Sequence, residues 1–221
     1  MKVSEALLQR KSVRAFTHQE VDKLLIKNIL ISAGFSPSGV NSQPWCVHVL
    51  SGQSKLTLQA LIEKEFRKGV KMNMDYQYYP IEWVEPYRSR RKECGLQMYS
   101  ALNISREDKQ QQQDQWAANY RSFDAPVMML FSMDAVFDTG SYLDFGIFLQ
   151  SLMLAVTEQG LATCPQVSLS EYPDIVKPFI KIASDAQLIC GMALGYEDTL
   201  AAINHYRTSR VPIDDWVTFL S

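Results

Sequence analysis

The sequence lacks the glycine patterns by which many enzymes bind a nucleotide. Its 10 glycines form neither G-x-G-x-x-G nor G-x-x-x-x-G-K-[ST], so the backbone cradles of a Rossmann domain and of a P-loop are both missing. No serine stands in G-x-S-x-G, and none of the 3 histidines lies in an H-x-x-x-H pair. These absences argue against a Rossmann or P-loop enzyme, a serine hydrolase and a zinc enzyme.

Cysteines and long apolar runs are also scarce. The 4 cysteines, at positions 46, 94, 164 and 190, are too dispersed for a C-x-x-C metal or redox pair and predict reduced thiols. The longest apolar runs, 125–133 and 142–156, are shorter than the about 20 residues that a membrane-spanning helix needs. No apolar leader follows Met1. We therefore expect a cytoplasmic protein.

The chain has no large excess of either charge. It contains 22 basic and 24 acidic residues, for a net charge of −2. We expect no binding to nucleic acid or to an acidic membrane, and a bound phosphate group must therefore meet a local cluster of cations. Hydrophobic residues make up 47% of the 221 positions, which is enough for a sizeable core. We expect residues 1–221 to form a single domain.

Periodicity and capping residues predict mixed α and β structure. Thr17-x-x-Glu20 resembles a capping box ahead of a helix that ends at Gly34, and Ser105-x-x-Asp108 resembles a second helix start. Residues 142–159 are apolar on nearly every side, so this predicted helix must be covered within one chain or at a subunit interface. The other predicted helices are 4–9, 54–68 and 86–102, and the predicted strands are 45–50, 126–133 and 186–194.

Three segments are hard to explain by packing alone. Residues 10–16 alternate between polar and apolar, which predicts an extended segment whose basic side chains share a face and suit a phosphate. The loop 36–45 is rich in short polar side chains and amides, which can hydrogen-bond the edge of a planar heterocycle. The basic residues of 207–212 can reach the same anion. A solvated basic turn and an ordinary helix-to-strand loop are the competing interpretations.

In this order, the three segments resemble the nitroreductase family of FMN-dependent oxidoreductases. That family has Arg-x-Ser-x-Arg/Lys after its first helix, a Pro-Ser-x-x-Asn-x-Gln-Pro-Trp loop and a basic Ser-Arg-x-Pro element. The counterparts here are 10–14, 37–45 and 209–212. The resemblance spans almost the whole chain. The context at 78–80, 85–91 and 163–166 is most similar to the nitrobenzoate-reductase-like branch.

The resemblance implies a fold and an assembly. The fold is α+β, with a central, mainly antiparallel sheet flanked by helices. Residues 196–221 would be a C-terminal arm exchanged in a homodimer, with FMN at the interface. The residues themselves suggest one further feature: the aromatic stretch 76–87 is too irregular for a core helix, so we expect it to lie over the flavin as a lid, within a helical excursion that covers 70–104, or in part to belong to the core.

The resemblance also assigns cofactor-binding roles to individual residues. Arg10, Lys11 and Ser12 would contact the phosphate and ribityl chain of FMN, and Arg14 the pyrimidine edge of the flavin. Arg210 would close over the phosphate, and Arg207 would replace a lysine that many members have where this chain has Thr208. The partner subunit would contribute the loop residues Pro37, Ser38, Asn41 and Gln43.

The segment Cys164, Pro165 and Gln166 matches the part of the family that passes along the flavin ring. A backbone N–H of that segment faces the flavin N5 in the family. Pro165 has no N–H, so Gln166 or a neighbour would serve.

The implied reaction is hydride transfer from NADH or NADPH to flavin N5, followed by reduction of a small aromatic nitro or quinone-like acceptor with ping-pong kinetics. The flavin carries the chemistry, so neither a catalytic acid–base side chain nor a metal is expected. The alternatives are a flavoenzyme of the same fold that performs reductive dehalogenation or flavin fragmentation, and a non-enzymatic dimer that stores or senses flavin.

Overall fold

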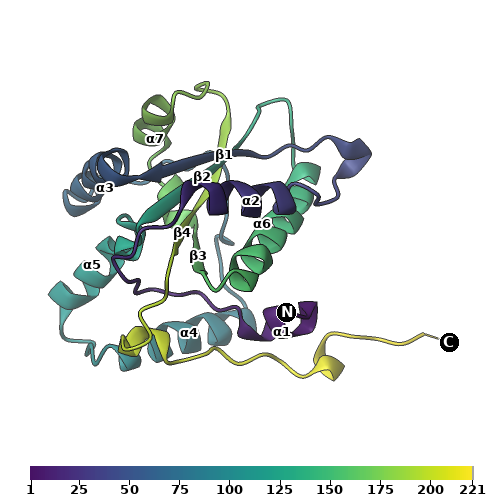
Figure 1. Cartoon of the computed structure of the whole chain (residues 1–221). Helices are drawn as coiled ribbons and strands as arrows, with labels where there is room; N and C mark the ends of the chain where they lie inside the picture. Colours follow the sequence, from purple (N-terminus) through teal and green to yellow (C-terminus); the bar gives the residue numbers. More distant parts are fainter. Residues whose placement is uncertain (221) are drawn as a thin grey trace.

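The computed structural model describes residues 1–220 and confirms the predicted α+β fold (Figure 1). Within these residues a four-stranded antiparallel sheet has the order β1-β2-β4-β3. β2 and β4 are central, and nearly all of their residues are buried. The strands are β1 (Cys46–Ser51), β2 (Val127–Met133), β3 (Ala162–Gln166) and β4 (Gln187–Gly195).

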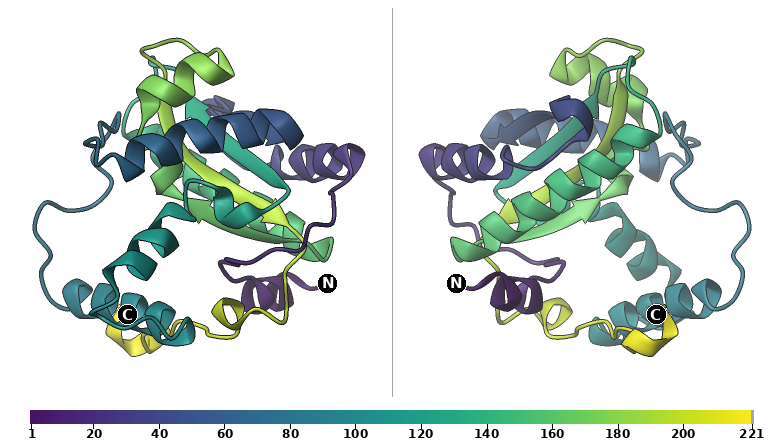
Figure 2. Two further views of the ribbon diagram at one scale, coloured as in Figure 1. Left: turned by 90° about the vertical axis from the view of Figure 1, so that its left-hand side faces the viewer. Right: turned by 90° about the vertical axis from the view of Figure 1, so that its right-hand side faces the viewer.

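Two pairs of helices cover the two faces of the sheet (Figure 2). Successive side chains of β2 point to opposite faces, as in any strand. Met129 and Phe131 pack toward α2 and α6, whereas Met128 and Leu130 pack toward α3 and α7. The sheet is therefore the middle layer of three. The bounds are α2 (Lys23–Ala33), α3 (Gly52–Arg67), α6 (Gly140–Glu158) and α7 (Pro173–Ile180).

Helix α6 is the apolar helix predicted from 142–159. Its buried residues include Phe145, Phe148 and Leu152, which belong to the cluster between the sheet and α2. Among residues 1–220, α6 is the one helix whose length of 19 residues and apolar composition would let it cross a membrane. Because one side packs on the sheet, we interpret α6 as a core helix.

The starts of two helices differ from the sequence prediction. Asp22, not Thr17, caps α2, because its carboxylate accepts hydrogen bonds from the N–H groups of Leu24 (2.8 Å) and Leu25 (3.0 Å). The Thr17 N–H instead donates to the carbonyl oxygen of Tyr196 at 2.9 Å. Helix α5 (Lys109–Ala117) is capped by Asp108 and not by Ser105.

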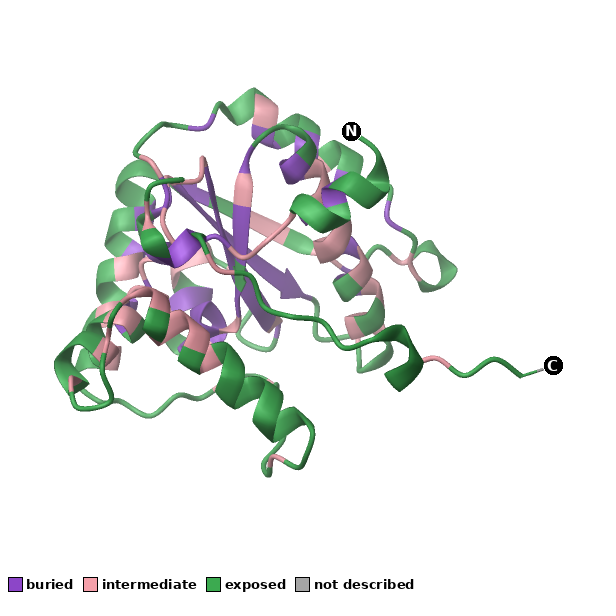
Figure 3. Cartoon of the chain, turned by 90° about the horizontal axis from the view of Figure 1, so that it is seen from below, coloured by how far each residue is buried: buried purple, intermediate pink, exposed green. Residues whose placement is uncertain are grey.

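The remaining elements lie around the layered core. Helix α1 (Val3–Gln9) precedes the extended residues 10–16, and α4 (Tyr87–Ala101) follows the irregular residues 68–86. No residue of α4 is buried, and Figure 3 shows exposed residues along much of α4 and along the C-terminal arm. Short 3-10 turns occur at Gly39–Asn41, Ser122–Asp124, Val167–Ser170, Ala202–Asn204 and Ile213–Asp215.

The irregular residues 68–86 are anchored to the core at two side chains. The carboxylate of Asp75 pairs with the Lys177 ammonium at 2.6 Å and accepts from the Leu188 N–H at 2.8 Å. The Tyr76 hydroxyl donates to the carbonyl oxygen of Ile189 at 2.6 Å. These contacts attach the excursion to α7 and to the start of β4.

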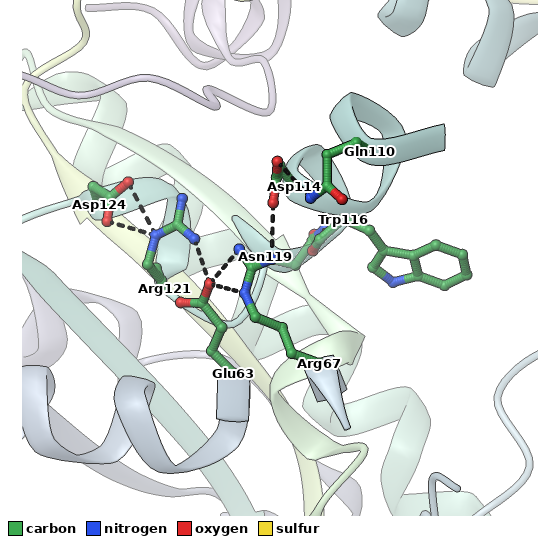
Figure 4. Close-up of polar contacts among 8 residues, drawn as sticks. All are labelled: Glu63, Arg67, Gln110, Asp114, Trp116, Asn119, Arg121 and Asp124. Carbon is green, nitrogen blue, oxygen red and sulfur yellow. Dashed lines mark hydrogen bonds and ion pairs between the residues drawn. The ribbon is translucent and has the colours of Figure 1, made fainter. Parts of the chain in front are cut away.

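An ion-pair network joins α3 to α5 and to the turn after α5 (Figure 4). Glu63 on α3 pairs with Arg67 (2.7 Å) and Arg121 (2.9 Å). Arg67 also reaches Asp114 on α5 (2.8 Å), and Arg121 reaches Asp124 (3.1 Å). A single exposed pair contributes little to stability, but the shared carboxylate of Glu63 fixes the turn 118–124 relative to α3.

Gly191 on β4 lies where the sheet meets the Val167–Ser170 turn too closely for any side chain. A Cβ atom at this position would lie 2.3 Å from Cδ1 and 2.7 Å from Cβ of Leu169, which is fully buried. We therefore expect Gly191→Ala to lower the free energy of unfolding by about 1–3 kcal/mol, because overpacking shifts the backbone.

Chemical denaturation of the purified variant measures this effect. Gly95→Ala on α4 is the matched control, since nothing lies within 4 Å of its Cβ, and it should be neutral or stabilising. An unchanged free energy of unfolding for Gly191→Ala would contradict the packing argument.

Candidate active site

Residues 10–16 run beside the free edge of β3, as the alternating pattern predicts. Ser12 forms a parallel bridge with Thr163, and the Val13 N–H donates to the Thr163 carbonyl oxygen at 3.0 Å. Burial raises the pKa of the Cys164 thiol, and the nearby side chains of Arg14, Ser12 and Arg10 offset part of that rise. The same face of the segment therefore carries two guanidinium groups and a hydroxyl.

Asn204 ties the C-terminal residues to this segment. Its buried side-chain amide accepts from the Arg14 N–H (2.9 Å) and donates to the carbonyl oxygens of Ala15 (2.8 Å) and Asp198 (2.9 Å). Its own carbonyl oxygen accepts from Lys11 Nζ at 2.6 Å. This contact fixes the start of the C-terminal arm against residues 11–15.

A cluster of three arginines forms where the two segments meet. Burial is the largest cause that lowers the pKa of Arg10, and the nearby guanidinium groups of Arg210 and Arg207 lower it further. Nη2 of Arg207 donates to the carbonyl oxygen of Arg10 at 2.7 Å. Nη1 of Arg210 donates to the carbonyl oxygen and to the hydroxyl oxygen of Thr208. Within residues 1–220, none of the three forms an ion pair with a carboxylate. Like charges held together without a counter-ion suit an anion such as a phosphate.

Lys11 lies apart from this cluster. Its ammonium pairs with the carboxylate of Glu197 at 2.7 Å, in addition to its bond to Asn204. The expectation that all the basic side chains of 10–16 share one face is thus wrong for Lys11, because this side chain turns toward Glu197. Its role toward a cofactor stays a prediction.

Strand β3 presents the predicted segment 164–166 beside the cluster. Pro165 is exposed, whereas Cys164 and Gln166 are buried. Proline suits an edge strand, where no partner needs its N–H. The Gln166 amide donates to the Asn119 carbonyl oxygen at 2.7 Å, but Oε1 of Gln166 and Oγ1 of Thr163 are buried without a hydrogen-bond partner in the described chain. Such atoms are rare in folded proteins and call for a partner outside the chain.

The loop predicted to contribute to the site lies elsewhere in this chain. Figures 1 and 2 place residues 36–45 near the far end of α2, well apart from segment 10–14. The Gly39 N–H donates to the carboxylate of Asp144 on α6 at 3.2 Å. One chain therefore does not bring this loop to the arginine cluster. The loop residues concerned are Pro37, Ser38, Asn41 and Gln43, of which Ser38 is half-buried and the others are exposed.

The aromatic residues of 76–87 form a row of neighbouring rings. Ring centroids lie 6.3 Å apart for Tyr76 and Tyr78, 4.6 Å for Tyr78 and Tyr79, and 5.8 Å for Tyr79 and Trp83. The guanidinium of Arg91 on α4 lies 5.1 Å from the centroid of the Trp83 ring. The row is a continuous apolar and π surface with a cation at one end.

Helix α4 and the C-terminal segment face each other. Helix α4 contacts the turn Ala202–Asn204, two residues before Tyr206. Tyr206 contacts Arg14. The excursion therefore borders the same region as the arginines and β3.

Two cavities of the described chain lie away from the arginine cluster and β3, although Tyr76 and Tyr78 of the aromatic row line the first. One of about 690 Å³ lies between the start of the excursion, α6 and the end of α7, and is lined by Asp75, Tyr76, Tyr142 and Lys177 among others. A second of about 350 Å³ lies between α3 and α7. Neither is lined by a residue of the predicted cofactor set.

Sequence reasoning missed Asn204, Tyr206 and Phe123. The ring of Phe123 lies 6.0 Å below the Arg14 guanidinium, and Nη1 of Arg14 donates to the Tyr206 hydroxyl at 3.1 Å. No local pattern marks these three residues, because each acts through a contact with a distant part of the chain.

A family model described as the nitroreductase family matches residues 7–196. The chain belongs to the nitroreductase family. It is 34% identical to the 4-nitrobenzoate reductase of Pseudomonas putida, over 96% of this chain and 92% of that protein. This relative confirms the similarity to the nitrobenzoate-reductase-like branch.

Solved structures of the family are similar over the whole chain. The FMN and NADPH-dependent nitroreductase NfnB from Sphigopyxis sp. strain HMH has a TM-score of 0.97 and 35% identity, with 100% of both chains covered. The FMN-dependent nitroreductase NfnB from Mycobacterium smegmatis, in complex with NADPH, has a TM-score of 0.93 and 30% identity over 99% of this nitroreductase-family chain and 98% of that one.

The thiols of this nitroreductase-family chain should differ sharply in reactivity. Cys46 and Cys94 are free and exposed. Burial raises the pKa of Cys164 to about 11 and that of Cys190 to about 12. A raised pKa keeps these two thiols protonated at pH 8, and the thiol is far less reactive than the thiolate. We expect a disulfide reagent at pH 8 to modify Cys46 and Cys94 rapidly and the other two only after unfolding.

A colorimetric thiol count with and without denaturant tests this prediction. The double variant Cys46→Ser/Cys94→Ser is the control and should lack the rapid phase. Rapid modification of Cys164 in the folded protein would contradict its assignment as a buried, neutral thiol.

Proposed function

We propose that the protein is an FMN-dependent oxidoreductase that takes hydride from NADPH or NADH and reduces nitroaromatic compounds. The observation that carries this function is the cluster of Arg10, Arg207 and Arg210 beside β3, which gathers three cations that pair with no carboxylate among residues 1–220. Membership of the nitroreductase family and the named activities of its relatives support the same conclusion.

The residues present fit FMN. Its phosphate is a dianion that the three guanidinium groups can hold with charge-assisted hydrogen bonds. The orphaned oxygens Oγ1 of Thr163 and Oε1 of Gln166 lie on the strand that would pass the flavin ring. Side chains three positions apart in a strand point to opposite faces, so one flavin would reach at most one of these two acceptors, for which its hydroxyl and N–H groups are suitable donors. The site therefore matches the anionic end and the polar, planar end of one ligand.

When bound, FMN supplies two-electron redox chemistry, and the chain supplies binding and electrostatics. Arg14 would place positive charge at the pyrimidine edge, where it stabilises negative charge. Reduction of a nitro group takes up protons and releases water; no acid–base side chain is assigned at the site, so these protons would come from solvent. The nicotinamide that donates hydride and the nitroaromatic acceptor would occupy the same face of the flavin in turn, so the oxidised nicotinamide leaves before the acceptor binds.

The excursion would cover the acceptor. The rings from Tyr76 to Trp83 can stack on a planar nitroaromatic ring. Arg91 and Arg90 lie over Trp83 and Tyr87 respectively, so a carboxylate on the acceptor would meet positive charge at this side. Because 4-nitrobenzoate is an aromatic carboxylate, it is a suitable first acceptor to assay.

The proposed assembly is a homodimer with FMN at the interface. The loop residues Pro37, Ser38, Asn41 and Gln43 lie far from the arginine cluster of their own chain, which is what a contribution from a partner requires. The arm beyond residue 210 leaves its own core with large apolar side chains exposed, among them Ile213, Trp216 and Phe219. An exposed apolar arm of this kind fits a partner's surface.

We further propose that residues 1–221 form one domain with a C-terminal arm at 196–221. We also propose that the protein is cytoplasmic. The four cysteines are all free, two of them exposed. Exposed free thiols are typical of a reducing compartment.

The first test compares FMN with riboflavin. Each charge-assisted contact contributes about 1.5–3 kcal/mol, so Arg10→Ala/Arg210→Ala should weaken FMN binding by about a hundredfold or more, and riboflavin binding by much less. Fluorescence titration of the apoprotein measures both dissociation constants. Arg106→Ala, an exposed arginine outside the site, is the control. Equal weakening of both ligands would show that the two arginines do not contact the phosphate.

Wild-type protein with bound FMN distinguishes an enzyme from a flavin-storage protein. Anaerobic NADPH should bleach the bound flavin within seconds, and 4-nitrobenzoate should restore the yellow colour. Flavin that stays oxidised under NADPH and NADH would refute the enzymatic function.

The second test concerns the dimer. Buried aromatic anchors typically contribute about 2 kcal/mol or more each. Because both subunits carry the change, Trp216→Ser/Phe219→Ser removes four such anchors, and it should raise the dimer dissociation constant by far more than a thousandfold and release FMN. Analytical ultracentrifugation measures the dissociation constant. Trp116→Ser on α5, which removes a comparably exposed tryptophan, should leave the dimer intact. A stable monomer that retains FMN would contradict the proposed interface.

A further inference from the structure

The side chain of Arg14 is held by a contact that the proposed function does not use. Nη1 of Arg14 donates to the Tyr206 hydroxyl at 3.1 Å and to the carbonyl oxygen of Ser12 at 3.3 Å. A guanidinium has five N–H donors. Within residues 1–220, Nε and Nη2 of Arg14 make no hydrogen bond, so they remain for a ligand. Tyr206 thus engages one nitrogen and leaves the others available.

A turn with unusual backbone geometry lies on another side of this guanidinium. Ser122, Phe123 and Asp124 have φ angles of 53°, 52° and 57°, three consecutive left-handed residues without a glycine. Such backbone is strained and occurs where the surroundings fix it. The ion pair of Arg121 with Asp124 closes this turn, and the Phe123 ring lies 6.0 Å from the centre of the Arg14 guanidinium.

Tyr206 is suited to hold a cation rather than to carry charge itself. Its ring is half-buried, and burial raises the pKa of its hydroxyl, which is therefore neutral at pH 7. A neutral phenol accepts a hydrogen bond from Arg14 through its oxygen. The backbone that carries Tyr206 is held in place two residues earlier by Asn204, whose side-chain amide binds the Arg14 backbone.

We propose that Tyr206 is a positioning residue for Arg14, which it orients toward the pyrimidine edge of the flavin and thereby favours the reduced cofactor. The inference rests on the proposed function, because it assumes that FMN occupies the site. It links the C-terminal segment to the redox potential of the cofactor. Reduction adds negative charge to the flavin, and a cation that is already held beside this charge stabilises it without reorganisation.

The test measures the midpoint potential of bound FMN in the full-length holoprotein, by enzymatic reduction in the presence of a reference dye. Tyr206→Phe keeps the ring and removes the acceptor oxygen. We expect it to reduce the preference of the protein for reduced over oxidised FMN by about tenfold, a fall of about 30 mV in a two-electron potential. Tyr172→Phe is the matched control, since its hydroxyl bonds the Val70 carbonyl oxygen on a different part of the molecule. It should leave the potential unchanged.

A double-mutant cycle with Arg14→Met shows whether Tyr206 acts through Arg14. Arg14→Met alone should lower the potential at least as far as Tyr206→Phe, and the double variant should match Arg14→Met. An unchanged potential in Tyr206→Phe would overturn the proposal. So would an equal fall with and without Arg14, because Tyr206 would then act on the flavin directly. Failure of the wild-type protein to bind FMN would instead refute the proposed function.

Discussion

One buried amide brings the two ends of the chain together. Asn204 satisfies both atoms of its side-chain amide on the backbone of residues 14, 15 and 198. A buried polar group without partners costs about 1–3 kcal/mol, so these three hydrogen bonds favour a single register between the N-terminal segment and the C-terminal turn. The arginines of both segments depend on that register, because neither segment alone carries the whole cluster. Residues almost 200 positions apart therefore form one surface.

The arginine cluster makes cofactor binding and folding parts of the same equilibrium. Without an anion, the guanidinium groups of Arg10, Arg207 and Arg210 repel one another, and the contacts of Asn204 and of Arg207 with the N-terminal segment keep them near. On the proposed function, the phosphate of FMN replaces that repulsion with attraction. A ligand that binds only the folded state stabilises it. On this proposal the phosphate would hold the two ends of the chain together, in addition to holding the flavin.

Local sequence patterns predicted individual helices and strands, whereas the sheet covered by helices was implied by the family resemblance, and the limits of the local patterns have a physical cause. The apolar runs of β2 and α6 could be identified because burial acts on each element over its whole length. Thr17 failed as a cap because its N–H finds the carbonyl of Tyr196, which no local window contains. The motifs located the segments of the site, but Lys11 pairs with Glu197 and Tyr206 holds Arg14 through contacts that depend on the tertiary structure. Composition and spacing carry no information about such partners.

The excursion is attached to the core by few side chains, chiefly Asp75 and Tyr76. Between these anchors and the end of α4 no residue is buried, so substitutions there disturb little of the sheet or of the arginine cluster. On the proposed function, electron supply and acceptor choice would then belong to separable parts of the molecule. Selection could alter the range of acceptors through the excursion, while the scaffold proposed to hold the cofactor stays unchanged. Such a division would permit one fold to adapt to new aromatic compounds through few mutations.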